Sequence, residues 1–256
     1  MKKIKSILVL LLLSTMLAVT LGATACSDNP SSSGEPTKPN PSIDNSVVEG
    51  DFKYGLTKED TYYVKAGNSQ IEGELIIPTT YNGKKVTSIG FSGDSYNISN
   101  GAFRSRWRIT SVTIPDSITY LGNFSFFKCT GLTSVYIPGS IENIGGGAFE
   151  DCTKLETVVL GEGVKDIKVD AFHGCEALVN VTIPHSVTII RGWSFAGCKS
   201  LTSINIPNSV TEIQNNTFYN CSSLETIIYD GTQEQWNRIN ISETAYPSTV
   251  KVVCIR

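Results

Sequence analysis

Residues 132–152 read LTSVYIPGSIENIGGGAFEDC, and variants of this pattern recur along most of the chain. At its start, Val135 and Ile137 alternate with Ser134 and Tyr136. Alternation of apolar and polar residues over a few positions predicts a short β-strand with one buried face. Pro138 lacks a backbone N–H donor, so it is expected to end the strand.

The remainder of the pattern predicts two further pieces of each unit. Ile141 and Ile144 favour a second, shorter piece that is extended or turning. The run from Ala148 to Cys152 favours a brief helical or 3-10 turn, in which the ring of Phe149 fills the centre. A unit of this length cannot bury its apolar side chains alone, so successive units are expected to stack.

Apolar positions recur along the chain with a constant step of 23 residues. The phenylalanine column consists of Phe103, Phe126, Phe149, Phe172, Phe195 and Phe218. The cysteine column consists of Cys129, Cys152, Cys175, Cys198 and Cys221. A fixed period of this length predicts a solenoid, here a predominantly β structure in which 23-residue coils form a parallel β-sheet ladder.

Three motifs of the repeat carry a resemblance to a known family. They are IPDSI at residues 114–118, AFEDC at residues 148–152 and LTSINI at residues 201–206. They resemble the BspA-type (treponemal) leucine-rich repeat, and the resemblance covers roughly residues 70–254. It implies a leucine-rich-repeat solenoid of the α/β class. Members of that family are associated with adhesion to host matrix glycoproteins and to other bacteria, so the resemblance implies a bacterial surface protein.

The first residues of the chain have the pattern of a secretory signal peptide. Met1–Lys5 is basic, Ile7–Leu21 is apolar, and small residues follow up to Ala25. Two cleavage chemistries remain open: an ordinary A-x-A site that releases the protein, or a bacterial lipobox that leaves Cys26 lipidated as the first mature residue. We favour lipidation of Cys26, because a tether rich in Pro and Ser follows it.

These features divide the chain into five segments. They are a signal peptide at 1–25, the lipid-attachment cysteine with a disordered linker at 26–49, an N-terminal cap with an irregular first repeat at 50–108, regular 23-residue repeats at 109–228, and a C-terminal cap at 229–256. The expected location is outside the cell, on the cell surface or outer membrane through a lipid anchor, with secretion as the alternative.

The cysteine column could hold a metal, form disulfides or bury small apolar groups. A metal site needs four converging ligands with local spacings, which a single row lacks. Neighbouring coils lie about 4.8 Å apart in a parallel ladder, a separation that suits the Cα atoms of a disulfide but leaves the side chains parallel. We therefore predict buried, reduced thiols, with disulfides between coils as the alternative.

Composition and motifs argue against catalysis and nucleic-acid binding. The chain has 24 acidic and 21 basic residues and a net charge of −3, whereas phosphate binding needs a basic face. It has only two histidines, and it lacks G-x-S-x-G, H-E-x-x-H and P-loop motifs. We predict a protein that is not an enzyme, without cofactor or metal, and with no contact to a membrane except through the lipid anchor.

Strand alternation then leaves one face of the ladder as the candidate binding surface. Its outward residues are small, uncharged or aromatic, and in leucine-rich repeats this face is the usual ligand surface. The candidate residues are Ser134, Tyr136, Thr157, Val159, Asn180, Thr182, Ser203, Asn205, Thr226 and Ile228. The sequence thus predicts a cell-surface protein that binds host matrix glycoproteins or other cells, with a glycan-binding surface lipoprotein as the alternative.

Overall fold

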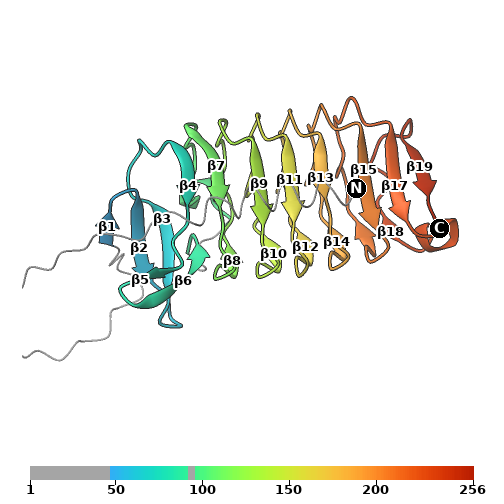
Figure 1. Cartoon of the computed structure of the whole chain (residues 1–256). Coiled ribbons are helices and arrows are strands. Elements are labelled where there is room, and N and C mark those ends of the chain that lie inside the picture. The colour runs from blue at the N-terminus through green and yellow to red at the C-terminus, as the bar shows by residue number, and fades with distance from the viewer. Residues whose placement is uncertain (1–46, 92–95) are drawn as a thin grey trace, which may run out of the picture. The chain divides into compact units, whose positions relative to one another are not determined.

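The structure is a computed structural model that describes residues 47–91 and 96–256. Two ladders of parallel strands run along it, one of long strands and one of short strands (Figure 1). The predicted signal peptide, Cys26 and most of the predicted linker lie outside the described residues. Strand pairing begins at Val47, within the segment that the sequence assigns to the linker.

An N-terminal cap closes the first end of the solenoid. Its strands are β1 (Val47–Glu49), β2 (Phe52–Leu56), β3 (Tyr62–Ala66), β5 (Thr80–Tyr81) and β6 (Lys84–Ile89). The first three pair antiparallel, and β6 then pairs parallel with β3. Because β6 also pairs parallel with β8 (Tyr120–Leu121), the cap continues directly into the coils.

The long strands form the predicted parallel ladder, one strand for each coil. They are β4 (Gly73–Ile76), β7 (Ile109–Thr113), β9 (Ser134–Ile137), β11 (Thr157–Leu160), β13 (Asn180–Thr182), β15 (Ser203–Pro207), β17 (Thr226–Asp230) and β19 (Lys251–Cys254). The register between regular coils is 23 residues, so that Val135 lies beside Val158 and Val158 beside Val181. The solenoid fold predicted from the repeat is therefore confirmed.

The long-strand ladder is interrupted between β13 and β15. It divides there into a five-stranded sheet that ends at β13 and a three-stranded sheet of β15, β17 and β19. At this step Val181 is only partly buried, whereas the equivalent Val158 is fully buried. The neighbouring Val179 is 43% exposed. The coils still stack, because the rings of Phe172 and Phe195 remain 5.4 Å apart across the interruption.

The second predicted piece of each unit forms the short-strand ladder. Its strands are β10 (Asn143–Ile144), β12 (Asp166–Ile167), β14 (Ile189–Ile190), β16 (Glu212–Ile213) and β18 (Asn240–Ile241). They pair parallel in this order, and the isoleucine of each pair points into the core except at Ile241, which is partly buried. Each regular coil therefore has two hydrogen-bonded sides.

Hydrogen-bonded turns, and not helices, join the short strand to the next long strand in the regular coils. Gly147 and Asp151 adopt left-handed φ values of 61° and 58° in the first quoted unit. The N–H of Phe149 donates to Ala171 O of the next coil (2.8 Å), whereas the N–H of Glu150 donates to Gly147 O of its own coil (3.1 Å). This alternation prevents the continuous i→i−3 bonds that a 3-10 helix requires, which corrects the predicted helical turn.

Two short helices occur in the described residues, both outside the regular coils. They are the 3-10 helix η1 (Ile98–Asn100) and α2 (Gln233–Trp236). A capping box fixes the start of α2: Thr232 accepts a hydrogen bond from the N–H of Gln235, whose side chain accepts one from the N–H of Thr232. Trp236 of this helix is buried against Tyr229 and covers the last coils.

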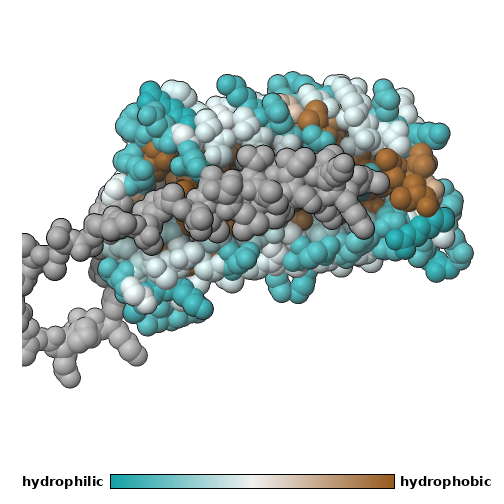
Figure 2. All heavy atoms as spheres, in the orientation of Figure 1, coloured by the Kyte–Doolittle hydropathy of each residue, from teal (hydrophilic) through white to brown (hydrophobic). Residues whose placement is uncertain are grey.

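The phenylalanine column is the centre of the core, as predicted. All six side chains are fully buried, and successive rings are stacked with centroids 5.2–5.8 Å apart. Figure 2 shows that the outside is mainly hydrophilic in one view, with hydrophobic atoms gathered at the end that carries β17 and β19. Burial of these repeated apolar side chains drives coil stacking.

The five cysteines of the column are buried and unpaired in the structure. Each thiol donates a hydrogen bond to the carbonyl oxygen of a phenylalanine in the preceding coil, for example from Cys152 to Phe126 (3.1 Å) and from Cys175 to Phe149 (3.2 Å). Burial raises the pKa of Cys129 to about 12 and also raises that of Cys152. The predicted burial of this column is confirmed, whereas the reduced state of the thiols stays a prediction.

Candidate binding surfaces

The ten residues predicted as a binding face lie together on the outward side of the long strands. None of them is buried, and Tyr136 is 37% exposed. Their rows follow the strand register: Thr157 lies between Ser134 and Asn180, and Val159 lies between Tyr136 and Thr182. The same pattern resumes after the interruption, where Ser203 pairs with Thr226 and Asn205 with Ile228.

The centre of this long-strand face is uncharged. Within the two described outward rows, charged residues occur only at the ends, as Glu74 on β4 and Lys251 on β19. Partly exposed apolar residues occur in one row, among them Ile76 (59% exposed), Val159 and Ile228. Depletion of charge at the centre is the compositional feature that distinguishes protein–protein interfaces from the remaining surface.

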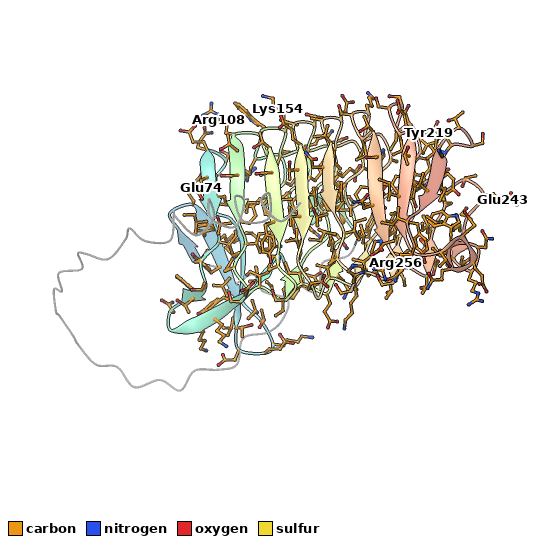
Figure 3. The ribbon with its side chains drawn as sticks, turned by 45° about the vertical axis from the view of Figure 1, so that its right-hand side comes forward. Glu74, Arg108, Lys154, Tyr219, Glu243 and Arg256 are labelled. Carbon is orange, nitrogen blue, oxygen red and sulfur yellow. The ribbon has the colours of Figure 1, made fainter. Side chains whose placement is uncertain are left out.

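Ion pairs between coils frame this uncharged centre. Where the strands begin, Arg108 Nη1 lies 3.3 Å from Glu72 Oε2, and Lys199 Nζ lies 2.7 Å from Glu176 Oε1. At the other end of the strands, Arg256 Nε lies 2.7 Å from Oδ1 of Asp230, the last residue of β17. Figure 3 shows Arg108 and Lys154 at the edge where the strands begin, and Arg256 away from that edge. The face therefore has the uncharged centre and polar rim of an interface.

A cluster of ionisable groups lies elsewhere, on the turns that follow the short strands. Asp170 accepts a hydrogen bond from Tyr96 (3.1 Å), and its other carboxylate oxygen lies 3.2 Å from His173 Nδ1. Burial, with a contribution from the Asp170 charge, raises the pKa of Glu150 to about 7. The hydrogen bond with Asp170 raises the pKa of His173. These groups could exchange protons near neutral pH.

This cluster lines neither the polar groove described below nor a smaller hollow lined by Asn208, Thr211 and Tyr229, among others. Asp170 retains a quarter of its side-chain exposure and His173 more than a third, so both are in contact with water. Its clearest structural effect is to connect Tyr96, which lies within the segment of the irregular first repeat, to Asp170, 74 residues later. The cluster is therefore a hydrogen-bonded network on the surface that is open to water.

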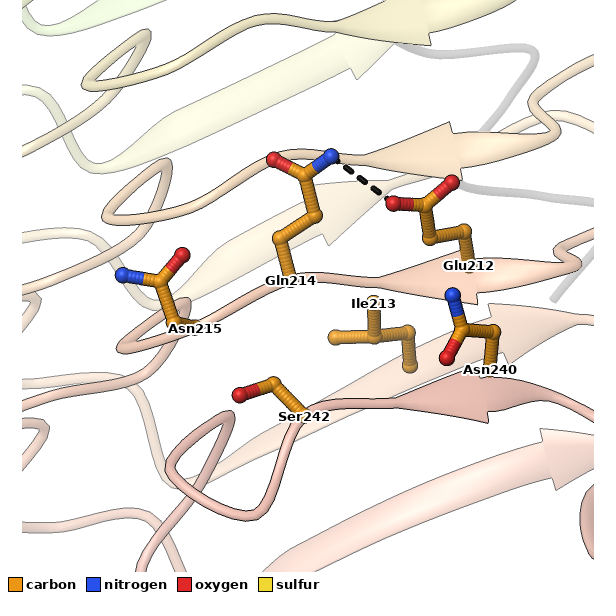
Figure 4. A pocket seen from close by; sticks show the side chains of 6 residues that line it. All are labelled: Glu212, Ile213, Gln214, Asn215, Asn240 and Ser242. Carbon is orange, nitrogen blue, oxygen red and sulfur yellow. Dashed lines mark hydrogen bonds between the residues drawn. The ribbon is translucent and has the colours of Figure 1, made fainter.

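The larger hollow is a polar groove on the short-strand ladder, with a volume of about 390 Å³. It is lined by Glu212, Ile213, Gln214, Asn215, Asn240 and Ser242 (Figure 4). Gln214 is held in place: its Nε2 donates to Glu212 Oε1 (2.8 Å), and its Oε1 accepts from the N–H of Gly192 (3.2 Å). Sequence reasoning did not identify this groove, because its polar residues occupy variable positions of the repeat.

Next to the groove lies a pair of aromatic side chains, also missed from sequence. The rings of Trp193 and Tyr219 have centroids 5.3 Å apart and planes inclined by 59°. Tyr219 is 56% exposed. The two residues belong to different columns and are 26 residues apart, one coil plus three positions. The same offset separates each column cysteine from its phenylalanine partner, so this spacing is the signal that could have found the pair.

Cys26, the predicted lipidation site, lies outside the described residues. Within residues 47–91 and 96–256, no group of three or more His, Cys, Asp or Glu side chains could hold a metal ion. In the same part of the chain, no helix has the length and apolar character needed to span a membrane.

Comparison with known proteins agrees with the repeat. The family model described as the BspA type leucine rich repeat region matches with six copies, over residues 75–191 and 154–253. No match is found among curated proteins. A structure of a leucine-rich repeat protein of T. pallidum is 23% identical, with a TM-score of 0.49, covering 80% of this chain and 83% of that one.

Two further solved structures are similar at lower identity. A leucine-rich repeat protein from Bacteroides ovatus is 20% identical over 81% of this chain and 78% of its own, with a TM-score of 0.45. A leucine rich cell surface protein from Faecalibacterium prausnitzii is 20% identical over 82% of this chain and 76% of its own, with a TM-score of 0.42. The family model alone spans more than half of the chain, so the chain belongs to the BspA-type leucine-rich repeat family.

Proposed function

We propose that this protein is a non-enzymatic binding protein of the cell surface, whose long-strand face holds a protein or glycoprotein partner. The leucine-rich repeat scaffold of the family suggests a role in protein interaction and is typically not enzymatic. The observation that supports the proposal most is the uncharged centre of the outward rows, framed by ion pairs such as Arg108–Glu72. The partners proposed are host matrix glycoproteins or surface proteins of other cells.

The residues of this face suit a partner that is recognised through complementary shape and hydrogen bonds. Tyr136 provides an amphipathic ring, and Val159 and Ile228 provide partly exposed apolar area. Hydroxyl and amide groups of Thr182 and Asn205 can donate and accept hydrogen bonds without the desolvation penalty of a charge. Since the strands are rigidly paired within each sheet, the partner meets a surface that is already ordered.

The test is to place charge at the centre of this face. A mature chain with Val159→Lys and Thr182→Lys is compared with the unchanged protein for binding to immobilised fibronectin, fibrinogen, laminin and collagen. A desolvated charge at an interface centre should weaken any specific binding by about 100-fold. The matched control is Thr188→Lys with Thr211→Lys, since these exposed threonines lie beside the short strands. Equal loss in both variants, or binding to none of the four proteins, contradicts the proposal.

The location is part of the same proposal: export under the signal-like leader and attachment through an acylated Cys26. A lipid anchor followed by a tether would hold the solenoid off the membrane surface and leave its faces accessible. Mass spectrometry of the mature N-terminus should find an acylated cysteine, and Cys26→Ala should prevent attachment. An unmodified chain that is released into the medium contradicts the anchor and favours secretion.

A further inference from the structure

We infer that the polar groove and the adjacent aromatic pair, named here the Trp193 site, bind a neutral oligosaccharide. The Trp193 site consists of Trp193, Tyr219, Glu212, Gln214, Asn215 and Asn240. It lies beside the short strands and shares no residue with the long-strand face, so the inference does not depend on the proposed protein partner. Four observations carry it.

First, the groove presents polar groups that are partly fixed and partly free. The bonds of Gln214 to Glu212 and to the N–H of Gly192 hold its amide and the carboxylate in defined positions (Figure 4). In contrast, the side-chain amides of Asn215 and Asn240 have no hydrogen-bond partner among the described residues. A site with both kinds of group can orient a ligand and still offer donors and acceptors to it.

Second, the aromatic pair is attached to the groove through the backbone. The N–H of Trp193 donates to the carbonyl oxygen of Asn215 (3.2 Å), and Asn215 is one of the residues that line the groove. Tyr219 follows four residues after Asn215 in the same coil and contacts the Trp193 ring. The aromatic pair and the groove therefore lie beside each other on neighbouring coils, joined by this backbone hydrogen bond.

Third, Trp193 occupies a backbone position that tryptophan does not favour. Its φ is 61°, in the left-handed region that glycine, asparagine and aspartate adopt most readily. Three of the equivalent positions in other coils hold those residues: Gly147, Asp170 and Asn216. Phe124 is the other aromatic at this position, and it is buried against its neighbours, whereas Trp193 is only half-buried. Strain that burial does not offset is typical of functional positions.

Fourth, the chemistry of the Trp193 site matches a sugar better than an ion or a charged peptide. The flat C–H face of a pyranose ring is apolar and packs on aromatic rings, while its hydroxyl groups bond to amides and carboxylates lying beside them. Glu212 is the single charged residue that lines the groove. The guanidinium of Arg191 is engaged by the carboxylate of Asp166 (2.7–3.0 Å), which raises its pKa with a contribution from the nearby Glu212. With this cation already paired and a carboxylate in its lining, the groove disfavours phosphate, sulfate and uronic acids, so the ligand expected is uncharged.

The experiment uses the mature full chain and named neutral polysaccharides. Retardation in native gels containing xyloglucan, mixed-linkage β-glucan, galactomannan or arabinoxylan identifies the class, and calorimetry with a hexasaccharide of that class gives the affinity. Trp193→Asn removes the ring but supplies a residue suited to a φ of 61°. We expect at least about tenfold weaker binding, as for other aromatic anchors, with an unchanged or higher melting temperature.

Two more variants complete the test. Asn215→Ala, which removes an unpartnered amide, should weaken binding without changing stability, and Tyr136→Ser on the long-strand face should leave saccharide binding unchanged. The inference is overturned if none of the four polysaccharides retards the protein, if only dextran sulfate does, or if Trp193→Asn binds as the unchanged protein does. A lower melting temperature for Trp193→Asn overturns it too, since the ring would then serve packing. Trp193-dependent binding to a matrix protein alone would point to a protein ligand instead.

Discussion

The inside and the outside of the coils differ in how strictly their residues repeat. In the phenylalanine column the same residue recurs six times, is fully buried and stacks on its copies. In the row that contains Tyr136, Val159, Thr182 and Asn205, neighbouring coils present different side chains to the outside. The repeated residues are therefore the ones that hold the coils together, whereas the residues of this outward row vary from coil to coil.

The interior is also chemically more specific than a row of apolar side chains. The thiol of each column cysteine donates to a phenylalanine carbonyl oxygen of the preceding coil, so that the two columns are joined by hydrogen bonds. A valine or alanine would fill similar space without this donor. The residue at each cysteine position must therefore have both the right size and a hydrogen-bond donor. The residues of the outward rows are subject to neither requirement.

The largest effect on stability is expected for Phe172→Ala, which tests whether the repeated buried residues hold the coils together. A fully buried ring is lost from the middle of the stack, and the free energy of unfolding should fall by about 3–5 kcal/mol. Coils on both sides should lose protection from hydrogen exchange, since each coil is supported only by its neighbours. Chemical denaturation measures the loss, and a change below about 1 kcal/mol would show that the column does not carry the core.

A smaller effect is expected where the cysteine column loses its donor. Cys175→Ala removes the bond to Phe149 O and leaves a small cavity, which should cost about 1–2 kcal/mol. Cys175→Ser keeps a donor of similar size and is the matched control. Denaturation curves for both variants measure the difference. If serine is as destabilising as alanine or more so, the hydrogen bond contributes nothing and the thiol acts only by its apolar volume.

The ionisable network on the turns should make stability depend on pH. Because the pKa values of Glu150 and His173 are both raised, the folded state binds protons more tightly than the unfolded chain. Stability is then greatest below the unfolded pKa values and falls as pH rises from about 5 to 8. Both groups are half-exposed, so the change should stay below about 1 kcal/mol.

Glu150→Gln is the variant that isolates one part of this pH effect. It should remove the contribution of Glu150, so its stability should exceed that of the unchanged protein most clearly at pH 8. Melting temperatures at pH 5, 6, 7 and 8 supply the measurement. Stability that rises with pH over this interval would contradict the assignment of raised pKa values to the network.

The smallest change in stability is expected on the outward face. Tyr136→Ser removes an aromatic ring that is 37% exposed and should alter the free energy of unfolding by less than about 0.5 kcal/mol. Binding to the partner of the long-strand face should nevertheless weaken by at least about tenfold, since exposed aromatics are frequent anchors. A large loss of stability with intact binding would contradict the comparison, because Tyr136 would then stabilise the fold and not bind a partner.

The repeat predicts most of the fold because each coil has the same residues in the same register. Val135, Pro138, Phe149 and Cys152 were sufficient to predict a strand, its end, the core ring and the buried thiol. The predicted helical turn was wrong, since left-handed residues such as Asp151 redirect alternate N–H groups to the next coil. A local sequence pattern cannot show whether an N–H group donates within its own coil or to the next one, because this depends on the position of the neighbouring coil.

Two other features could not be derived from the period. The interruption between β13 and β15 occurs where Val181 and Ile204 both satisfy the repeat, so nothing in the sequence marks it. The Trp193 site joins positions that are 26 residues apart, and a search for columns at 23 residues passes over it. The long-strand face was predicted because alternation alone determines which side chains point outward.

The most direct test of the comparison is a thiol-labelling experiment mapped by mass spectrometry. The protein carrying Tyr136→Cys is treated with N-ethylmaleimide in its native state, and again after denaturation without reductant. The account predicts that the cysteine at position 136 is modified rapidly, whereas the five column cysteines, each at most 3% exposed, are modified only after denaturation, and then completely. Rapid native labelling of any column cysteine, or a column cysteine that stays unmodified in the denatured chain, would contradict the division between a closed interior and an open outer face.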